Sequence, residues 1–289
     1  MFLGRPHAIA TGVAAGAGEL ALIDPGPTPC LDALDLGLQQ QGMRLADVTH
    51  ILLTHIHLDH AAATGVIVRQ HPRVKVLVHE RGAPHMADPS KLVASAARLY
   101  GARMDELWGE CAPVPAANLH VLKGGERIAA GGRTFEVAYT PGHAVHHVSY
   151  FDRASGVAFV GDTGGVQIDG GWLLPPTPPP DIDLKAWRTS ADVIERWNAE
   201  SLFLTHFGPA LLPPRPHLQT LMENLETVAA FVRASLNEPG SDDDRAAWFA
   251  GQVRREFRRS MSEAQLASYG LAAPFELLWL GLARYWRKR

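Results

Sequence analysis

The chain has 289 residues, of which 46% are hydrophobic and 20% are charged. This composition is typical of a folded globular protein, and it excludes a disordered tail, a coiled coil and a collagen-like repeat. The 27 basic and 30 acidic side chains give a formal charge of −3, so no net positive field draws the chain to nucleic acid or to acidic membranes. Two cysteines, Cys30 and Cys111, are too few for a disulfide framework and fit a reducing compartment.

The composition along the chain also bears on its location. Residues 1–18 lack a basic, apolar leader with a cleavage site, and no uncharged apolar run reaches the roughly 18 residues that a membrane span needs. The apolar run 275–282 contains Glu276 and leads into Arg284. It predicts an amphipathic terminal helix, with a membrane-surface helix as the alternative. We therefore expect a cytoplasmic protein with no membrane partner.

Strands and helices alternate through most of the chain. Short apolar or alternating runs, several bounded by turn residues, predict strands. They lie at 20–23, 48–54, 74–79, 118–122, 126–128, 134–139, 148–151, 157–160 and 201–205. Helical spacing predicts helices over 30–42, 61–70 and 183–199, the last with Asp181 or Asp183 as its N-cap. The remainder from His217 to the end predicts three helices.

Two features divide the chain. Strand patterns stop after the Pro-rich segment 209–216, so we expect a catalytic domain over 1–210 and a helical region over 211–289. The segment 84–112 has helical character and is too long for a simple connection, which predicts a helical lid over the functional site. Within it, Tyr100, Met104 and Trp108 follow helical spacing and form an apolar face that either covers the site or packs on the core.

The densest cluster of polar side chains follows the second predicted strand. His55, His57, Asp59 and His60 lie within six residues, directly after the apolar run 51–53. Alternate side chains of an extended chain share a face, so His55 and His57 can point to one place. Asp59 and His60 would then open the following helix and point to a neighbouring place. Imidazole and carboxylate ligands suit zinc, manganese or iron.

Three later candidates repeat this placement at the ends of strands. His143 follows the strand at 134–139, Asp162 follows the strand at 157–160, and His206 follows the strand at 201–205. Because ligands in α/β architectures bind beyond the carboxyl ends of strands, these segments predict one site assembled from distant parts of the chain.

The combined pattern His-x-His-x-Asp-His, then His, Asp and His, resembles the metallo-β-lactamase superfamily, and within it glyoxalase II and related hydrolases. The resemblance covers roughly residues 8–210. It implies an α+β fold, a four-layer αβ/βα sandwich, here with a C-terminal helical extension. It also implies that His55, His57 and His143 hold one metal, that Asp59, His60 and His206 hold a second, and that Asp162 bridges both. His147 is interpreted as a supporting residue behind the ligands.

These observations predict a dinuclear metal-dependent hydrolase that uses a metal-bound hydroxide on a small ester, thioester or lactone. Asp59 is the candidate catalytic residue, orienting the nucleophile and carrying its proton. The cofactors would be two divalent ions, zinc first, with manganese or iron as alternatives. A phosphodiesterase and a non-catalytic metal-binding protein are the competing hypotheses. The expected partner is a small-molecule substrate, not nucleic acid, and a homo-oligomer is left open.

Overall fold

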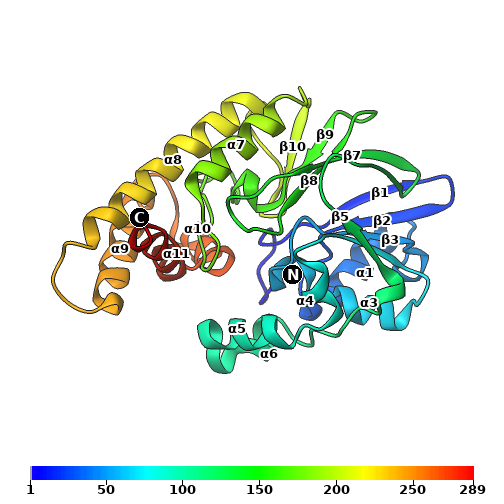
Figure 1. Ribbon diagram of the computed structural model, residues 1–289, viewed down its shortest axis with the longest axis horizontal. Coiled ribbons are helices and arrows are strands. Elements are labelled where there is room, and N and C mark those ends of the chain that lie inside the picture. The colour runs from blue at the N-terminus through cyan, green and yellow to red at the C-terminus, as the bar shows by residue number, and fades with distance from the viewer. Residues whose placement is uncertain (1) are drawn as a thin grey trace.

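The computed structural model describes residues 2–289, and two β-sheets face each other at its centre (Figure 1). The first sheet has five strands in chain order: β1 (Gly12–Gly16), β2 (Glu19–Ile23), β3 (His50–Leu52), β4 (Lys75–His79) and β5 (Leu119–Leu122). The second sheet runs in the order β11-β10-β9-β8-β7-β6. Its strands are β6 (Arg127–Ala130), β7 (Arg133–Tyr139), β8 (Val148–Asp152), β9 (Val157–Phe159), β10 (Ser201–Leu204) and β11 (Gly208–Pro209).

In the central strands, alternating side chains are buried on opposite faces, which builds three apolar layers. In β2, Ala21 and Ile23 face the second sheet, whereas Leu20 and Leu22 pack under helices. In the second sheet, Tyr150 of β8 points between the sheets and Phe151 points outward. Both faces of the central strands are therefore covered, which explains why strands such as β2 and β3 are apolar on both sides.

Helices complete the outer layers. The helices that precede β10 along the chain are α1 (Leu31–Gln40), α2 (Leu58–Ala61), α3 (Thr64–Gln70), α4 (Ala83–Ala87), α5 (Ser90–Tyr100), α6 (Met104–Leu107) and α7 (Leu184–Glu195). Side chains of α1 and α3 pack on the first sheet, and side chains of α7 pack on the second. The four-layer αβ/βα sandwich that the resemblance implied is thus confirmed. Asp183 is the N-cap of α7, where it accepts hydrogen bonds from the backbone N–H groups of Lys185 and Ala186.

The C-terminal region holds four helices, so the prediction of three is wrong. They are α8 (Pro214–Ser235), α9 (Asp242–Phe257), α10 (Glu263–Ala272) and α11 (Phe275–Arg287). The break before α11 falls at Pro274, which lacks the N–H that a continuous helix needs. Apolar side chains of all four helices belong to one core with β9, β10 and α7. The division at residues 210 and 211 remains a prediction, because this core spans it.

A further difference from the sequence-based expectation concerns a strand. The strand β1 was not predicted, because its sequence Gly-Val-Ala-Ala-Gly has no strand-like alternation. Its antiparallel pairing with β2 holds this segment in the extended conformation. Within residues 2–289 no single helix is long and apolar enough to cross a membrane. The pair α10 and α11 passes that test only together, with a bend of 48° between the two helices.

Candidate metal centre

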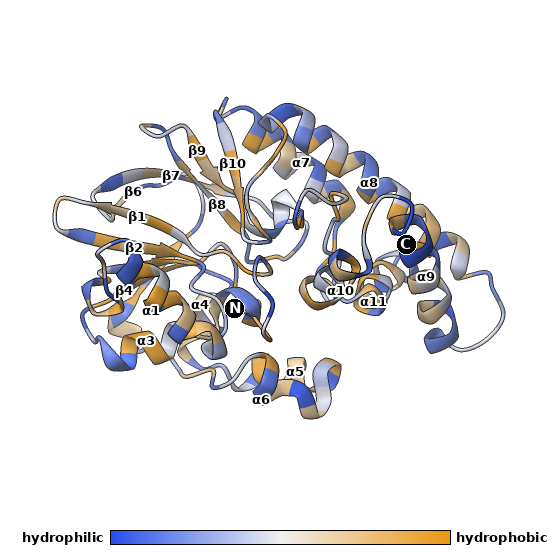
Figure 2. Cartoon of the chain, turned by 180° about the vertical axis from the view of Figure 1, so that it is seen from behind, coloured by the Kyte–Doolittle hydropathy of each residue, from blue (hydrophilic) through white to orange (hydrophobic). Residues whose placement is uncertain are grey.

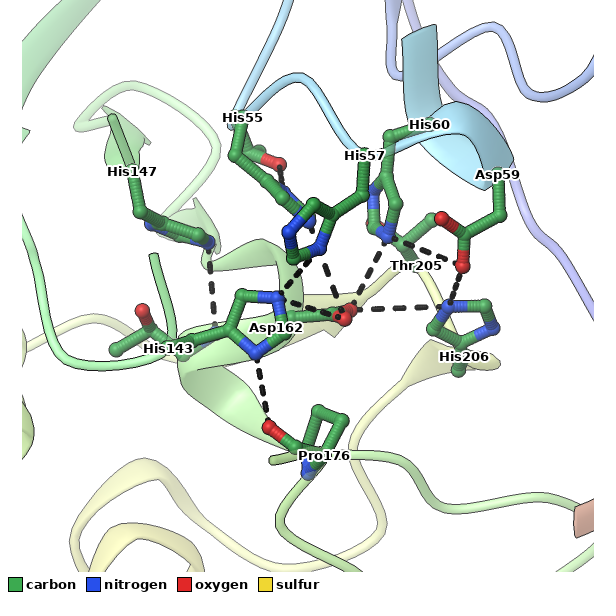
Figure 3. A network of polar contacts seen from close by, with 12 residues as sticks. His55, His57, Asp59, His60, His143, His147, Asp162, Pro176, Thr205 and His206 are labelled. Atoms are coloured by element: carbon green, nitrogen blue, oxygen red, sulfur yellow. Dashed lines mark hydrogen bonds and ion pairs between the residues drawn. The ribbon is translucent and has the colours of Figure 1, made fainter. Parts of the chain in front are cut away.

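All seven predicted ligands come together at one edge of the sandwich (Figure 3). His55 and His57 lie in the extended segment after β3, and Asp59 and His60 lie in the first turn of α2. From the second sheet, His143 follows β7, Asp162 follows β9, and His206 follows β10. The site therefore lies at the seam between the two sheets, with part of its side chains from each.

Asp162 lies at the middle of this cluster and presents its two oxygens to different histidines (Figure 3). Its Oδ2 atom lies 3.4 Å from Nε2 of His143 and 4.0 Å from Nε2 of His55. Its Oδ1 atom lies 3.2 Å from Nε2 of His60 and 3.7 Å from Nε2 of His206. One carboxylate thus faces two groups of imidazoles, one with each oxygen.

The two groups are compact. The ligand-type atoms of His55, His57, His143 and Asp162 all lie within 4.8 Å of one another, and so do those of Asp59, His60 and His206. In the first group, Nδ1 of His57 lies 2.9 Å from Nε2 of His143. In the second group, Oδ2 of Asp59 lies 3.3 Å from Nε2 of His206 and 3.8 Å from Nε2 of His60.

Four of the five histidines among the predicted ligands make a hydrogen bond through Nδ1 on the side away from the cluster, and this bond orients the ring. Nδ1 of His143 donates to the carbonyl of Pro176 at 2.8 Å, and Nδ1 of His206 donates to the carbonyl of Ala8 at 2.6 Å. Since each Nδ1 carries the proton, each Nε2 keeps a lone pair directed into the cluster. His57 differs, because its Nδ1 faces the cluster.

Asp24 is the functional residue that the sequence pattern did not reveal. It follows β2 and is completely buried. Its Oδ2 accepts hydrogen bonds from Nδ1 of His60 at 2.8 Å, from the hydroxyl of Thr54 at 2.7 Å and from that of Thr205 at 2.9 Å. Its Oδ1 accepts from the backbone N–H of Thr54. Asp24 also groups with His55 and His60, but these four hydrogen bonds give it an orienting role.

The Thr54 hydroxyl connects Asp24 to His55 and so orients the His55 ring as well. Because the hydroxyl donates to Asp24, it accepts from Nδ1 of His55, which lies 3.0 Å away. His147 supports the other side as expected, since its Nδ1 bonds the Thr140 hydroxyl and its Nε2 accepts a weak bond from the N–H of Thr163. His147 thus lies behind the ligands.

At two of the strand ends, a glycine allows the backbone to lie close to neighbouring atoms. Gly161, directly before Asp162, has φ +47°, and a Cβ there would lie 2.5 Å from the hydroxyl of Thr54. Gly142, directly before His143, has φ +135°, and a Cβ there would lie 2.3 Å from Cα of Trp187. Any larger residue would displace the ligand that follows.

Several buried polar atoms at the centre lack a hydrogen-bond partner in the described part of the chain, which indicates what kind of ligand the centre would bind. Nε2 of His55, His60 and His206 and Oδ1 of Asp162 are buried and have no hydrogen-bond partner among the described residues. Unsatisfied buried groups cost free energy, so native proteins rarely keep several together. Four such atoms facing one another, all of ligand type, fit a bound cation.

The electrostatics favour the same fit. Burial, aided by neighbouring imidazoles, lowers the pKa of His55 well below its usual value, and burial lowers the pKa of His57 to about 3. Burial alone would raise the pKa of Asp162, but three nearby imidazoles hold it well below its usual range. Burial would lower the pKa of His60, but the surrounding carboxylates raise it well above the usual value. Neutral imidazoles and ionised carboxylates are the forms that coordinate metals, and a cation replaces the proton on His60.

A cavity of about 530 Å³ opens onto this centre. His57, Asp59 and Asp162 form part of its lining. Of the apolar residues singled out in the segment 84–112, Tyr100 and Trp108 line the cavity, and Met104 packs beside them. Residues of that segment therefore form part of the cavity wall, and its role as a lid remains a prediction.

Side chains from other parts of the chain differ in their relation to this cavity. Trp172 does not line the cavity; it packs at 5.0 Å, ring centre to ring centre, from Phe257 in the C-terminal core. The cationic side chains of Arg254, Arg258 and Arg259 form ion pairs with glutamates on the helices instead of facing the site. His85, by contrast, lines the cavity.

Curated relatives resemble part of the chain. A metallo-beta-lactamase fold-containing protein, ST1585 of Sulfurisphaera tokodaii, is 30% identical over 149 residues, which are 50% of this chain and 55% of that protein. A hydroxyacylglutathione hydrolase of Fuscovulum blasticum is 32% identical over 150 residues, 52% of this chain and 44% of that enzyme. The chain thus spans about half the length of the curated relatives it matches.

Solved structures match over more of the chain. A metallo-beta-lactamase family protein of Thermus thermophilus, TTHA1429, has a TM-score of 0.70 at 23% identity, covering 96% of this chain and 87% of that one. TTHA1623 in a di-iron-bound form has a TM-score of 0.50 at 26% identity, covering 69% and 88%. The family model described as the metallo-beta-lactamase superfamily matches residues 4–206, from before β1 to the last candidate ligand. The chain belongs to the metallo-beta-lactamase superfamily.

Proposed function

We propose that the chain is a dinuclear metal-dependent hydrolase of a small ester, thioester or lactone. The observation that carries the proposal is the placement of Asp162, which turns one oxygen toward each group of ligand atoms. A carboxylate in this position is suited to bridge two cations. The relatives named hydroxyacylglutathione hydrolase and the neighbour solved in a di-iron-bound form support the same proposal.

Each predicted ligand has a place in this arrangement. His55, His57 and His143 would hold one ion, Asp59, His60 and His206 would hold the other, and Asp162 would contribute to both. When bound, the ions supply Lewis acidity, lower the pKa of water to about 7 and stabilise negative charge on an attacked carbonyl. Zinc fits this donor set first, with manganese and iron as alternatives.

The protein's own groups position the reaction. Asp59 is a cavity-lining carboxylate whose side chain is 17% exposed, so it can reach both substrate and solvent. Burial alone would raise the pKa of Asp59, but His60 and His206 lower it, which keeps Asp59 ionised and able to accept a proton. The segment 84–112 excludes bulk water from one side of the centre.

The first test is metal content per chain by elemental analysis of protein purified without added metal. We expect two ions per chain in the wild type and about one in His60→Ala. His57→Ala should lose much of the metal and nearly all hydrolysis while circular dichroism shows a folded chain. One iron per chain that is unaffected by His60→Ala would overturn the dinuclear assignment.

The second test is turnover of a panel of carboxylic esters, thioesters and lactones by metal-reconstituted protein. Turnover that disappears on chelation and returns with metal supports the proposal. Metal-dependent cleavage of bis(p-nitrophenyl) phosphate in preference to every carboxylic substrate would replace it with a phosphodiesterase. Full occupancy of both positions without turnover of any panel member would indicate a metal-binding protein instead.

A further inference from the structure

Two walls of the cavity above the metal centre are largely apolar. On one side, Leu92, Ala96 and Leu99 of α5 follow one another at helical spacing and all line it. Leu99 keeps 37% of its surface exposed, although it is one of the larger apolar side chains of the chain. Leu92 and Ala96 also pack on the core, whereas Leu99 stays exposed, so this wall of the cavity leaves room for another apolar group.

The opposite wall is apolar as well, and it comes from distant parts of the chain. Pro178 and Pro179 contribute from the segment after β9, and Pro274, Leu277 and Leu278 contribute from the start of α11. Figure 2 shows α5 and α6 on one side and α10 and α11 on the other, with hydrophobic residues in each of these helices. The lining residues place the cavity between the two pairs of helices.

Cations gather at the solvent edge of this cavity. Arg81, Lys91 and Arg98 all line it and are exposed. None of the three has an ion-pair partner among residues 2–289, whereas most of the arginines on the C-terminal helices do. Outside the metal centre, the carboxylate that lines the cavity is Asp181. In a chain whose formal charge is −3, this edge is therefore locally positive.

The volume of about 530 Å³ is of the size that small-molecule sites occupy. Its chemistry changes from the ligand cluster at the buried end, through the apolar walls, to the cations at the edge. We propose that the site takes an amphipathic organic anion. The hydrolysable bond would lie at His57, Asp59 and Asp162, the apolar body between α5 and α11, and the anionic group at Arg81, Lys91 and Arg98. The assignment of the cleaved bond rests on the proposed function; the binding preference does not.

The binding test uses octanoate, acetate and octylammonium as probes, with the full chain as purified and calorimetry as the readout. We expect octanoate to bind at least about tenfold more tightly than acetate, because only octanoate reaches the apolar walls. Octylammonium should bind more weakly than octanoate, because the edge repels it. Equal affinity for octanoate and acetate would overturn the proposal.

Two double variants test the role of the cationic edge independently of the metal centre. Lys91→Gln combined with Arg98→Gln should weaken octanoate binding about three- to tenfold at low salt, with a smaller effect at high salt. Arg73→Gln combined with Arg255→Gln removes the same charge from exposed positions outside the cavity and should change nothing. If both double variants bind octanoate like the wild type, the carboxylate is held elsewhere and the edge has no such role.

The kinetic arm compares p-nitrophenyl octanoate with p-nitrophenyl acetate. We expect a higher kcat/KM for the octanoate ester, and Leu99→Gln should reduce that ratio because it makes the α5 wall polar. Turnover without a preference for the longer ester would support the hydrolase but overturn the proposal that the substrate is an amphipathic anion. Binding that follows chain length and charge, without turnover of any ester, would contradict the hydrolase and keep the amphipathic site.

Discussion

Oδ2 of Asp24 lies 2.8 Å from Nδ1 of His60, and neither side chain is exposed to solvent. The pair joins the end of β2 to the first turn of α2, two elements that lie 36 residues apart at this contact. A carboxylate behind a ligating imidazole fixes its tautomer and increases its basicity. Asp24 therefore determines how His60 presents Nε2 to the centre without touching a substrate itself.

Replacing Asp24 tests this role. In Asp24→Asn, the amide group that takes the place of Oδ2 meets three donors, so the hydrogen bonds to His60, Thr54 and Thr205 cannot all form. We expect metal affinity to fall about 10–100-fold, measured by competition with a chromogenic chelator. Asp152→Asn is the control, because Asp152 is also buried, in β8, and lies outside the ligand groups. An unchanged affinity in Asp24→Asn would refute the role.

Asp162→Asn probes the shared carboxylate. The change keeps the shape of the side chain but leaves one oxygen for two groups of histidines. Metal content should fall from two ions per chain to one or fewer, and the loss should be larger than in Asp59→Asn, which affects one group. Two ions per chain at wild-type affinity would show that Asp162 does not join the groups.

Gly281→Ala tests how the C-terminal helix supports the site. A Cβ at Gly281 would lie 2.1 Å from the carbonyl oxygen of Thr177, so the segment that carries Pro176 must move. Pro176 accepts the hydrogen bond from His143, which links the change to the centre. We expect a loss of about 1–3 kcal/mol in the free energy of unfolding and lower metal affinity.

The matched control for this change is Gly251→Ala in α9. Nothing lies within 4 Å of a Cβ at Gly251, so alanine there should raise the stability by about 0.5–1 kcal/mol. Chemical denaturation measures both variants under one set of conditions. Equal stability of the two variants would show that the Thr177 segment accommodates a methyl group without cost.

The thiol of Cys111 gives a pH-dependent prediction away from the metal. Burial and the nearby Glu110 raise its pKa to about 11, above the ordinary value of 9.0. At pH 8 the reactive thiolate should be about 100-fold scarcer than in an unperturbed cysteine. In Cys30→Ala, alkylation by iodoacetamide should be slow at pH 8 and accelerate steeply toward pH 11. A plateau near pH 9 would contradict the shift.

The sequence predicts which side chains meet at one edge, because several of them follow recognisable strands; that they bind metal remains a prediction. His55, His143, Asp162 and His206 each come within four residues of the end of a strand, and parallel neighbours such as β9 and β10 bring their ends to one edge. Asp24 obeys the same rule after β2, but its Asp-Pro-Gly context also indicates a turn. Its partner Thr205 is 181 residues away, and no local pattern could reveal that contact.

The helical region was less predictable for a different reason. Pro274 is visible in the sequence as a helix-breaking residue, but the packing of Phe275 and Trp279 in the shared core is what shows α11 to be a helix separate from α10. Likewise, Arg81, Lys91 and Arg98 give no sequence signal as a group. They come to line one cavity through the turn before α4 and the course of α5, which long-range packing sets.

The position of the centre at the seam has a consequence for the lifetime of the protein. His55, His57, Asp59 and His60 come from the first sheet, and His143, Asp162 and His206 come from the second. Ions bound by side chains from both sheets would hold the two halves of the sandwich together, so separating the sheets would require breaking coordination bonds. Thermal resistance should then follow metal supply. Cells starved of metal would lose the folded chain to proteolysis through the opened seam, and not merely its turnover.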